Sequence, residues 1–297
     1  MKKEYHVKVP AFSIKNVSGV KFGGFAVDNH MCCGSHKRVL RGKNLPEAMI
    51  IAADKGKGWH LTTSFEWASM AYLWQKANTI DDCIVDIHAE TYQWVMGLFM
   101  QPDGHVDILA NIDVTYAGSP YGRGTISNSG KANPILKCDG KGLNWHKQWK
   151  PGSFNGLSIY IAEANNGAGE FFPIQKTTEN SIILSKGVVP GNGIATYCII
   201  KHVAIDVTSG MTSGNKITKL RESDAELKPF AIPASSGNNN VEMIADRYWF
   251  YKGDSVRAAL RGGYFLTAAV AGVFYLVLID APSYSGCDIG FRACKAL

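Results

Sequence analysis

The sequence predicts an α+β protein with two helices near the N-terminal third and a β-rich remainder that carries long insertions. Two helix-like segments lie before residue 80, and after about residue 100 short β-like runs alternate with turns rich in glycine, asparagine and serine. The chain has 297 residues, of which 46% are hydrophobic and 19% charged. This length and composition indicate a soluble globular protein with a sizeable core.

The first predicted helix begins after Asn44 and covers about ten residues. Asn44 is a typical N-cap, Pro46 suits the first helical turn, and Glu47 places an acidic group near the positive end of the helix. Gly56 and Gly58 follow the apolar run 48–53 and are expected to end the helix.

The second predicted helix begins at Thr63. Thr63 and Glu66 have the spacing of a capping box. Large apolar residues then recur at helical spacing, at Trp67, Met70, Ala71 and Trp74. This stripe is expected to face the core.

The middle of the chain, from about 100 to 240, is predicted to consist of short strands and long insertions within a single domain spanning 1–297. The clearest β-like runs are 106–109, 157–161, 181–184 and 196–200. No repeat of fixed period is visible. We place an insertion at approximately 115–225, and a separable subdomain over these residues is the alternative.

Two motifs bracket the C-terminal segment: Arg261-Gly262-Gly263 and Ile289-Gly290-Phe291-Arg292. Between them, large apolar and aromatic residues alternate with small polar ones, and Ala281-Pro282 marks a surface turn. This frame resembles the C-terminal part of the formylglycine-generating-enzyme branch of the C-type lectin fold. Within that branch it is most similar to the variable proteins of diversity-generating retroelements.

Two upstream segments extend the resemblance. Residues 60–68 are similar to the family's segment that leads into a helix and contains Glu66-Trp67. Residues 86–97 match the strand that carries Trp94 and Gly97, although the family's Gly-Asn is Ala89-Glu90 here and its usual Glu is Gln93. The resemblance implies a C-type-lectin-like fold of the formylglycine-generating-enzyme type, with 246–297 as the variable region.

In such proteins, mutation of adenines in interleaved codons diversifies a ligand-binding surface. The residues implied here as variable and ligand-binding are Phe250, Tyr251, Gly253, Tyr264, Phe265, Leu266, Thr267, Val270, Val277, Ile279, Asp280, Tyr284, Gly286, Cys287 and Asp288. Those implied as scaffold are Trp67, Trp94, Arg261, Gly262, Gly263, Phe274, Leu276, Leu278, Gly290, Phe291 and Arg292. The variable positions between the two motifs all hold residues that adenine replacement in an asparagine codon can produce.

The period of a β-strand supplies a physical reason for this division. If 273–279 is one strand, Phe274, Leu276 and Leu278 face the core, while Val277 and Ile279 share the opposite, solvent face. Exposed aromatic and β-branched side chains then form a patch suited to binding. The alternative is a strand buried on both faces, with Val277 and Ile279 in the core.

Catalytic, cofactor and metal sites are not expected. Enzymes of the resembled branch use a cysteine pair just before the terminal Gly-Phe-Arg, whereas Cys287 and Cys294 straddle that motif here. The cluster His30-Met31-Cys32-Cys33-Gly34-Ser35-His36 is a possible zinc site, but a turn with partly buried thiols is the preferred interpretation. The seven cysteines lack paired spacing and are expected to be mostly free thiols.

The charge pattern and the apolar runs exclude further classes of function. The net charge is +6, but lysine and arginine are scattered, so no nucleic-acid partner is expected. No signal peptide, transmembrane segment or membrane insertion is expected, because the longest apolar run, 268–279, is too short for a span.

The resemblance implies a receptor-binding protein that attaches a virus or phage to its host. Its partner would be a protein or glycan ligand on a bacterial or archaeal cell surface, and its location the tip of a virion tail fibre or the host cell surface. The alternatives are a formylglycine-generating-enzyme-like oxidase, and a structural virion component that uses the C-terminal segment as a homo-oligomer interface.

Overall fold

The structure is a computed structural model that describes residues 6–14, 20–28, 40–77, 91–110, 120–130, 133–137, 149–187, 190–237, 246–263 and 272–296. The fold is mostly β, with 44% of the described residues in strands and 13% in helices, and it contains a closed six-stranded barrel. The predicted α+β class, a C-type-lectin-like layout of two helices with a sheet, is therefore wrong.

The helices are α1 (Leu45–Ala53), α2 (Ser64–Ala77), the short α3 (Ala164–Gly167) and the 3-10 helix η2 (Lys228–Phe230). The strands are β1 (His6–Val9), β2 (Phe25–Asp28), β3 (Trp59–Leu61), β4 (Tyr92–Met100), β5 (His105–Leu109), β6 (Tyr121–Ser127), β7 (Ile135–Lys137), β8 (Ser158–Ile161), β9 (Glu170–Thr177), β10 (Ser181–Leu184), β11 (Gly193–Asp206), β12 (Asn215–Leu220), β13 (Pro233–Gly237), β14 (Arg247–Phe250), β15 (Arg257–Arg261), β16 (Leu276–Leu278), β17 (Ile289–Phe291) and β18 (Ala293–Ala296).

The two long helices form where local signals predict them. In α1, the Asn44 side chain accepts a hydrogen bond from the Glu47 backbone N–H at 2.8 Å, and the Glu47 carboxylate accepts one from the Asn44 N–H at 3.1 Å. In α2, Thr63 and Glu66 make the same reciprocal pair, at 2.9 and 3.1 Å. Trp67 in the predicted stripe is buried. Both capping predictions are confirmed.

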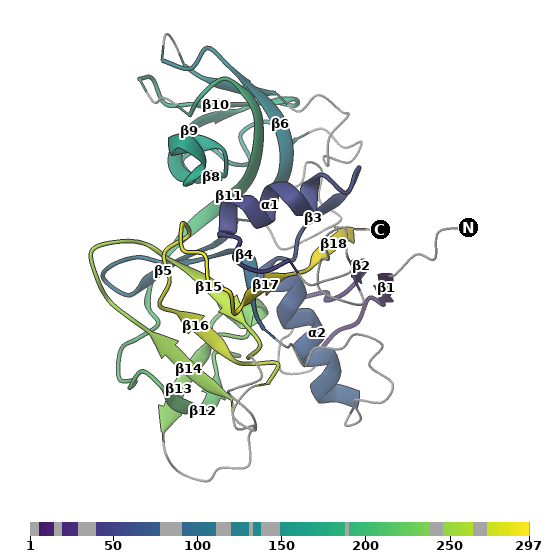
Figure 1. Cartoon of the computed structure of the whole chain (residues 1–297), viewed down its shortest axis with the longest axis vertical. Coiled ribbons are helices and arrows are strands. Elements are labelled where there is room, and N and C mark those ends of the chain that lie inside the picture. The colour runs from purple at the N-terminus through teal and green to yellow at the C-terminus, as the bar shows by residue number, and fades with distance from the viewer. Residues whose placement is uncertain are drawn as a thin grey trace.

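A large sheet runs through the molecule in the order β13-β12-β14-β16-β15-β4-β5-β11-β6-β7-β10-β9-β8, and β17 pairs with β4. A second sheet has the order β1-β2-β18-β3. The C-terminal strand β18 thus lies between two N-terminal strands (Figure 1). The last residues of the chain are in this way fixed to its beginning.

The barrel occupies the far end of the large sheet. Its strands pair in the closed order β11-β6-β7-β10-β9-β8-β11, because the long β11 pairs with β6 on one edge and with β8 on the other. A hydrophobic cluster distinct from the main core fills it, including Trp149, Phe154 and Tyr197. Figure 1 shows the barrel as a lobe beyond α1. It lies within the residues predicted as an insertion.

Polar and aromatic contacts join the barrel to the rest of the molecule. Arg123 on β6 forms an ion pair with Asp54 after α1, at 2.6 Å, and the ring of Tyr121 lies 4.1 Å from that of His60 on β3.

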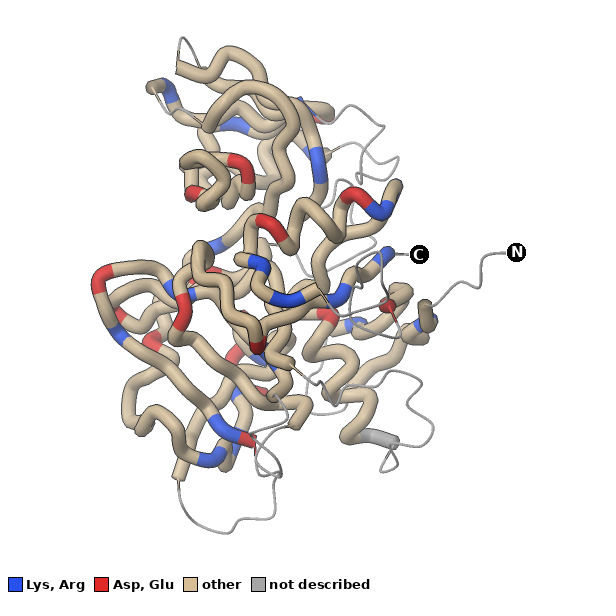
Figure 2. Tube along the Cα trace, viewed as in Figure 1, with Lys and Arg blue, Asp and Glu red and all other residues tan. Residues whose placement is uncertain are grey.

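Lysine and arginine are interspersed with acidic residues over the barrel and over the rest of the described molecule (Figure 2). Among the described residues, no helix combines the length and apolar character needed to cross a membrane.

Candidate functional site

Arg261 of the Arg-Gly-Gly motif is a buried anchor at the end of β15. Its guanidinium donates hydrogen bonds to the backbone carbonyls of Phe230 at 2.6 Å, Ala231 at 3.2 Å and Phe274 at 3.4 Å. Burial lowers the pKa of Arg261 to about 10. The side chain thereby ties η2 to the segment that leads into β16.

Asp246 fixes the same segment from the other side. Its carboxylate accepts a hydrogen bond from the Phe274 N–H at 2.8 Å, and burial raises its pKa to about 7. A Cβ atom on Gly272 would lie 2.1 Å from the Asp246 carboxylate, so only glycine fits there. The Trp67 indole donates to the Val273 carbonyl at 2.7 Å. We call Trp67, Asp246, Arg261, Gly272 and Phe274 the buried frame.

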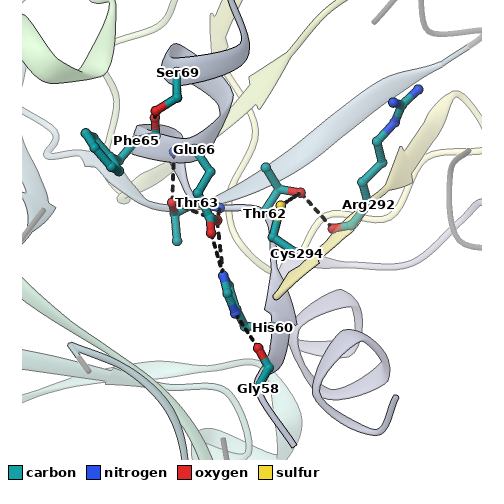
Figure 3. A network of polar contacts seen from close by, with 9 residues as sticks. All are labelled: Gly58, His60, Thr62, Thr63, Phe65, Glu66, Ser69, Arg292 and Cys294. Carbon is teal, nitrogen blue, oxygen red and sulfur yellow. Dashed lines mark hydrogen bonds and ion pairs between the residues drawn. The ribbon is translucent and has the colours of Figure 1, made fainter. Parts of the chain in front are cut away.

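The terminal motif is held by a separate polar network, drawn in Figure 3. The Thr62 N–H and hydroxyl both donate to the Arg292 carbonyl, at 3.1 and 3.0 Å. Near by, the His60 ring lies 2.9 Å from the Glu66 carboxylate, which also caps α2. The Cys294 thiol lies 3.3 Å from the Thr62 hydroxyl, and burial raises its pKa. These contacts are structural, because all of the groups are buried.

Two loops carry the described variable positions that reach solvent: 251–256 and 279–288. They follow the neighbouring strands β14 and β16, which pair in parallel. The Tyr251 N–H donates to the Leu278 carbonyl at 3.1 Å, and the Ala258 N–H to the Asp280 carbonyl at 2.9 Å. The two loops are therefore adjacent, and we call their surface the loop face.

Tyr251 dominates the first loop. Its side chain is 57% exposed, and the Arg257 guanidinium lies over its ring at 5.1 Å. A Cβ atom on Gly253 would lie 2.7 Å from both of these side chains. Arg257 was not among the residues predicted for the site, although it is a cation that directly follows the 251–256 turn.

Tyr284 dominates the second loop and is 47% exposed. Gly286, predicted to be a ligand-binding position, is buried against Tyr284 and Asp288, because its Cβ would lie 3.1 Å from the tyrosine ring and 2.4 Å from the carboxylate. Burial and then the charge of Asp288 raise the pKa of Asp280, whereas Arg257 lowers it. Cys287 is an exposed free thiol. The loop face thus combines two tyrosines, three carboxylates, the ammonium of Lys252 and a thiol, with the Arg257 guanidinium at its edge.

The predicted strand over 273–279, with one buried face and one exposed face, is only partly present in the structure. Residues 272–275 form a turn closed by the Tyr275 N–H and the Gly272 carbonyl, so the strand is limited to β16. Val277, predicted to be outward, is 5% exposed, because it lies in register between Trp249 and Leu260 on the two adjacent strands. The expectation that Val277 lies on a solvent face is therefore wrong.

The other predicted positions divide as follows. Ile279 and Phe250 are half-buried, and Phe250 packs against Tyr248 with ring centres 5.0 Å apart. The scaffold residues that are buried are Trp67, Trp94, Arg261, Gly262, Gly263, Phe274, Leu276, Leu278, Gly290, Phe291 and Arg292. Tyr264, Phe265, Leu266, Thr267, Val270 and the cluster 30–36 lie outside the described residues.

The loop face is suited to non-covalent binding. Tyrosine supplies contact area with little loss of rotamer entropy, and the carboxylates and Arg257 can pair with polar groups of a ligand. Over the described ranges, no set of three or more histidine, cysteine, aspartate or glutamate residues is arranged to hold a metal ion. In comparisons with known proteins, no family model and no curated protein matches this sequence.

Proposed function

We propose that this chain is a ligand-binding protein that presents a diversified surface on a fixed scaffold, like the variable proteins of diversity-generating retroelements. One observation carries the proposal. The large apolar side chains exposed in the described part of the chain are Ile194, Tyr251 and Tyr284, and both tyrosines lie in the segment predicted to vary. Exposed tyrosines of this kind are frequent binding hot spots.

The contrast between the loop face and the buried frame supports the same function. Asp246 and Arg261 are bonded to backbone atoms and are buried, so the frame does not depend on what the loops display. Side chains such as Tyr284 and Cys287 are exposed and can change identity at small cost to folding. A binding protein that must alter its specificity needs this separation.

The proposed ligand is a protein or glycan on the surface of a bacterial or archaeal cell, and the proposed setting is virus attachment at a tail-fibre tip. The motifs Arg261-Gly262-Gly263 and Ile289-Gly290-Phe291-Arg292, with adenine-reachable residues between them, support this class. The surrounding DNA offers a direct test. A reverse transcriptase gene beside an imperfect repeat of the final coding segment, differing only at adenines, is expected.

A binding experiment tests the site itself. Fluorescently labelled full chain is applied to a glycan array and to a panel of intact bacterial and archaeal cells, and bound signal is compared between variants. Tyr251→Ala and Tyr284→Ala should each reduce binding at least tenfold, about 1.4 kcal/mol or more. Ile194→Ala is the matched control, because Ile194 is somewhat more exposed than either tyrosine but lies on the barrel strand β11.

Two outcomes would contradict the proposal. One is a loss of binding in Ile194→Ala that equals the loss in the tyrosine variants. The other is a change of oligomer mass, measured by light scattering, in Tyr251→Ala or Tyr284→Ala, which would instead identify the loop face as an interface between copies of the chain.

A further inference from the structure

A polar cluster next to the first loop of the loop face lies on strands β5 and β11 and on the turn between β4 and β5. His202 on β11 is directly opposite Asp107 on β5, and Asp206 on β11 is opposite His105. The two histidines are accessible, with 57% of the His202 side chain and 33% of the His105 side chain exposed. Neighbouring strands thus bring two imidazoles to one surface.

Each imidazole has a carboxylate near its Nδ1 atom, but only the contact of His202 has hydrogen-bond geometry. Nδ1 of His202 lies 3.0 Å from Asp107 Oδ1, and Nδ1 of His105 lies 2.9 Å from Asp103 Oδ2. Asp107 is itself buried and accepts a hydrogen bond from the Gln101 side chain at 2.5 Å. These contacts leave Nε2 of each ring as the nitrogen available to a ligand.

This arrangement has two properties of a transition-metal site. First, a histidine that binds a metal commonly has its other ring nitrogen bonded to a carboxylate, which fixes the tautomer and orientation, and His202 has such a bond to Asp107. Second, the ring centres of His105 and His202 are 5.9 Å apart. A zinc–nitrogen distance of about 2.1 Å and a near-tetrahedral angle place two ligating imidazole centres about 5.3 Å apart, so a side-chain shift of roughly half an ångström brings the two rings to this separation.

We propose that His105 and His202 bind one divalent late transition-metal ion, of the Zn²⁺ or Cu²⁺ class, through their Nε2 atoms. Imidazole nitrogen is a preferred ligand of these ions. Since the described residues supply no third ligand, solvent or a group from a bound partner completes the coordination. Asp107 acts as the positioning residue of His202. The ion would be exchangeable and would keep open coordination positions.

The pair lies close to the first loop of the loop face. Asp206, opposite His105, accepts a hydrogen bond from Lys252 at 2.8 Å, and Lys252 follows Tyr251 in the chain. An ion with open coordination positions would therefore lie next to the loop face, which we propose binds other molecules. The metal proposal itself is independent of that function.

The experiment is calorimetric titration of the metal-stripped full chain with Zn²⁺ alone at pH 7.5. The wild type is expected to show a site that His105→Gln and His202→Gln each weaken at least tenfold. Asp107→Ala should weaken the same site about 10–100-fold, and Asp107→Asn, which keeps an oxygen acceptor for Nδ1, should restore most of the affinity. Circular dichroism verifies that each variant is folded.

Two control variants separate this site from other histidines. His6→Gln removes a ring that packs edge-on against Trp59. His30→Gln removes one histidine of the cluster 30–36. Both variants should leave the Zn²⁺ affinity of the His105–His202 site unchanged. Electron paramagnetic resonance with one equivalent of Cu²⁺ should report two nitrogen ligands in the wild type and one in His202→Gln. Wild-type Zn²⁺ affinity in either His105→Gln or His202→Gln would overturn the proposal.

Discussion

Replacing Asp246 by asparagine tests whether the buried frame excludes solvent from this carboxyl group as fully as its contacts imply. Asp246 is 1% exposed, and burial raises its pKa from 3.8 to about 7, although the Phe274 N–H and the Arg261 charge act in the opposite direction. The folded protein therefore holds this proton more tightly than the unfolded chain does. Its contribution to stability is complete below pH 3.8 and is lost as the pH rises towards 7.

The size of the effect follows from the shift. About three pKa units at about 1.4 kcal/mol each give a loss of about 4 kcal/mol between pH 4 and pH 7. The asparagine in Asp246→Asn can still accept the Phe274 hydrogen bond but cannot ionise. The difference in unfolding free energy between wild type and variant should therefore change by about 4 kcal/mol across this range.

The assay is urea denaturation of both proteins at unit intervals from pH 4 to pH 8. Taking the difference between the two proteins removes the contributions of all other titrating groups. A difference that stays constant with pH would refute the reasoning, because it would mean that Asp246 titrates alike in the folded and unfolded states.

Two further predictions concern the frame and the loops. Leu276→Ala, at a fully buried position of β16, should lower the unfolding free energy by about 2–5 kcal/mol in urea denaturation. Tyr284→Ala, on the loop face, should change it by no more than about 0.5 kcal/mol. Similar losses in both variants would contradict the separation of a structural core from an exchangeable loop face. Gly272→Ala should cost about 1–3 kcal/mol because its Cβ meets the Asp246 carboxylate, and a double-mutant cycle should show most of this cost removed in an Asp246→Ala background.

The helices were predictable because their signals are local. Asn44 with Glu47, and Thr63 with Glu66, lie three residues apart, so the sequence contains the whole capping interaction. The barrel was not predictable in this way. Its closure depends on the pairing of β11 with both β6 and β8, and no residue within one strand indicates which distant strand lies beside it. The fold class was therefore wrong although the helices and several strands were right.

The candidate site shows the same limit. The alternation in 273–279 correctly indicated that Leu276 and Leu278 are buried, but it could not indicate that Trp249 and Leu260 flank Val277 from adjacent strands. Burial of the second face depends on neighbours that are distant in sequence. The loop positions were more accessible to prediction, because turn residues such as Pro282 and Ser283 mark the surface directly.

Gly272 and Gly286 show how the segment 272–288 can keep its backbone position while some of its side chains change. At Gly272, the obstacle to a side chain is the carboxylate of Asp246, which is buried and bonded to the backbone. At Gly286, the obstacles are the ends of Tyr284 and Asp288, which themselves belong to the loop face and can rotate. A substitution at 272 must therefore displace a buried carboxylate, whereas one at 286, although Gly286 is itself buried, displaces side chains that are partly exposed.

The anchors of the second loop complete this argument. Backbone carbonyls hold it in place: Pro282 accepts from the Leu45 N–H at 3.0 Å, Gly286 from the Gly42 N–H at 3.0 Å, and Asp288 from the Tyr92 N–H at 2.9 Å. Such bonds do not depend on which side chains the loop carries. The loop can therefore exchange its side chains and keep its position, which is the physical requirement for a surface whose specificity changes while the fold does not.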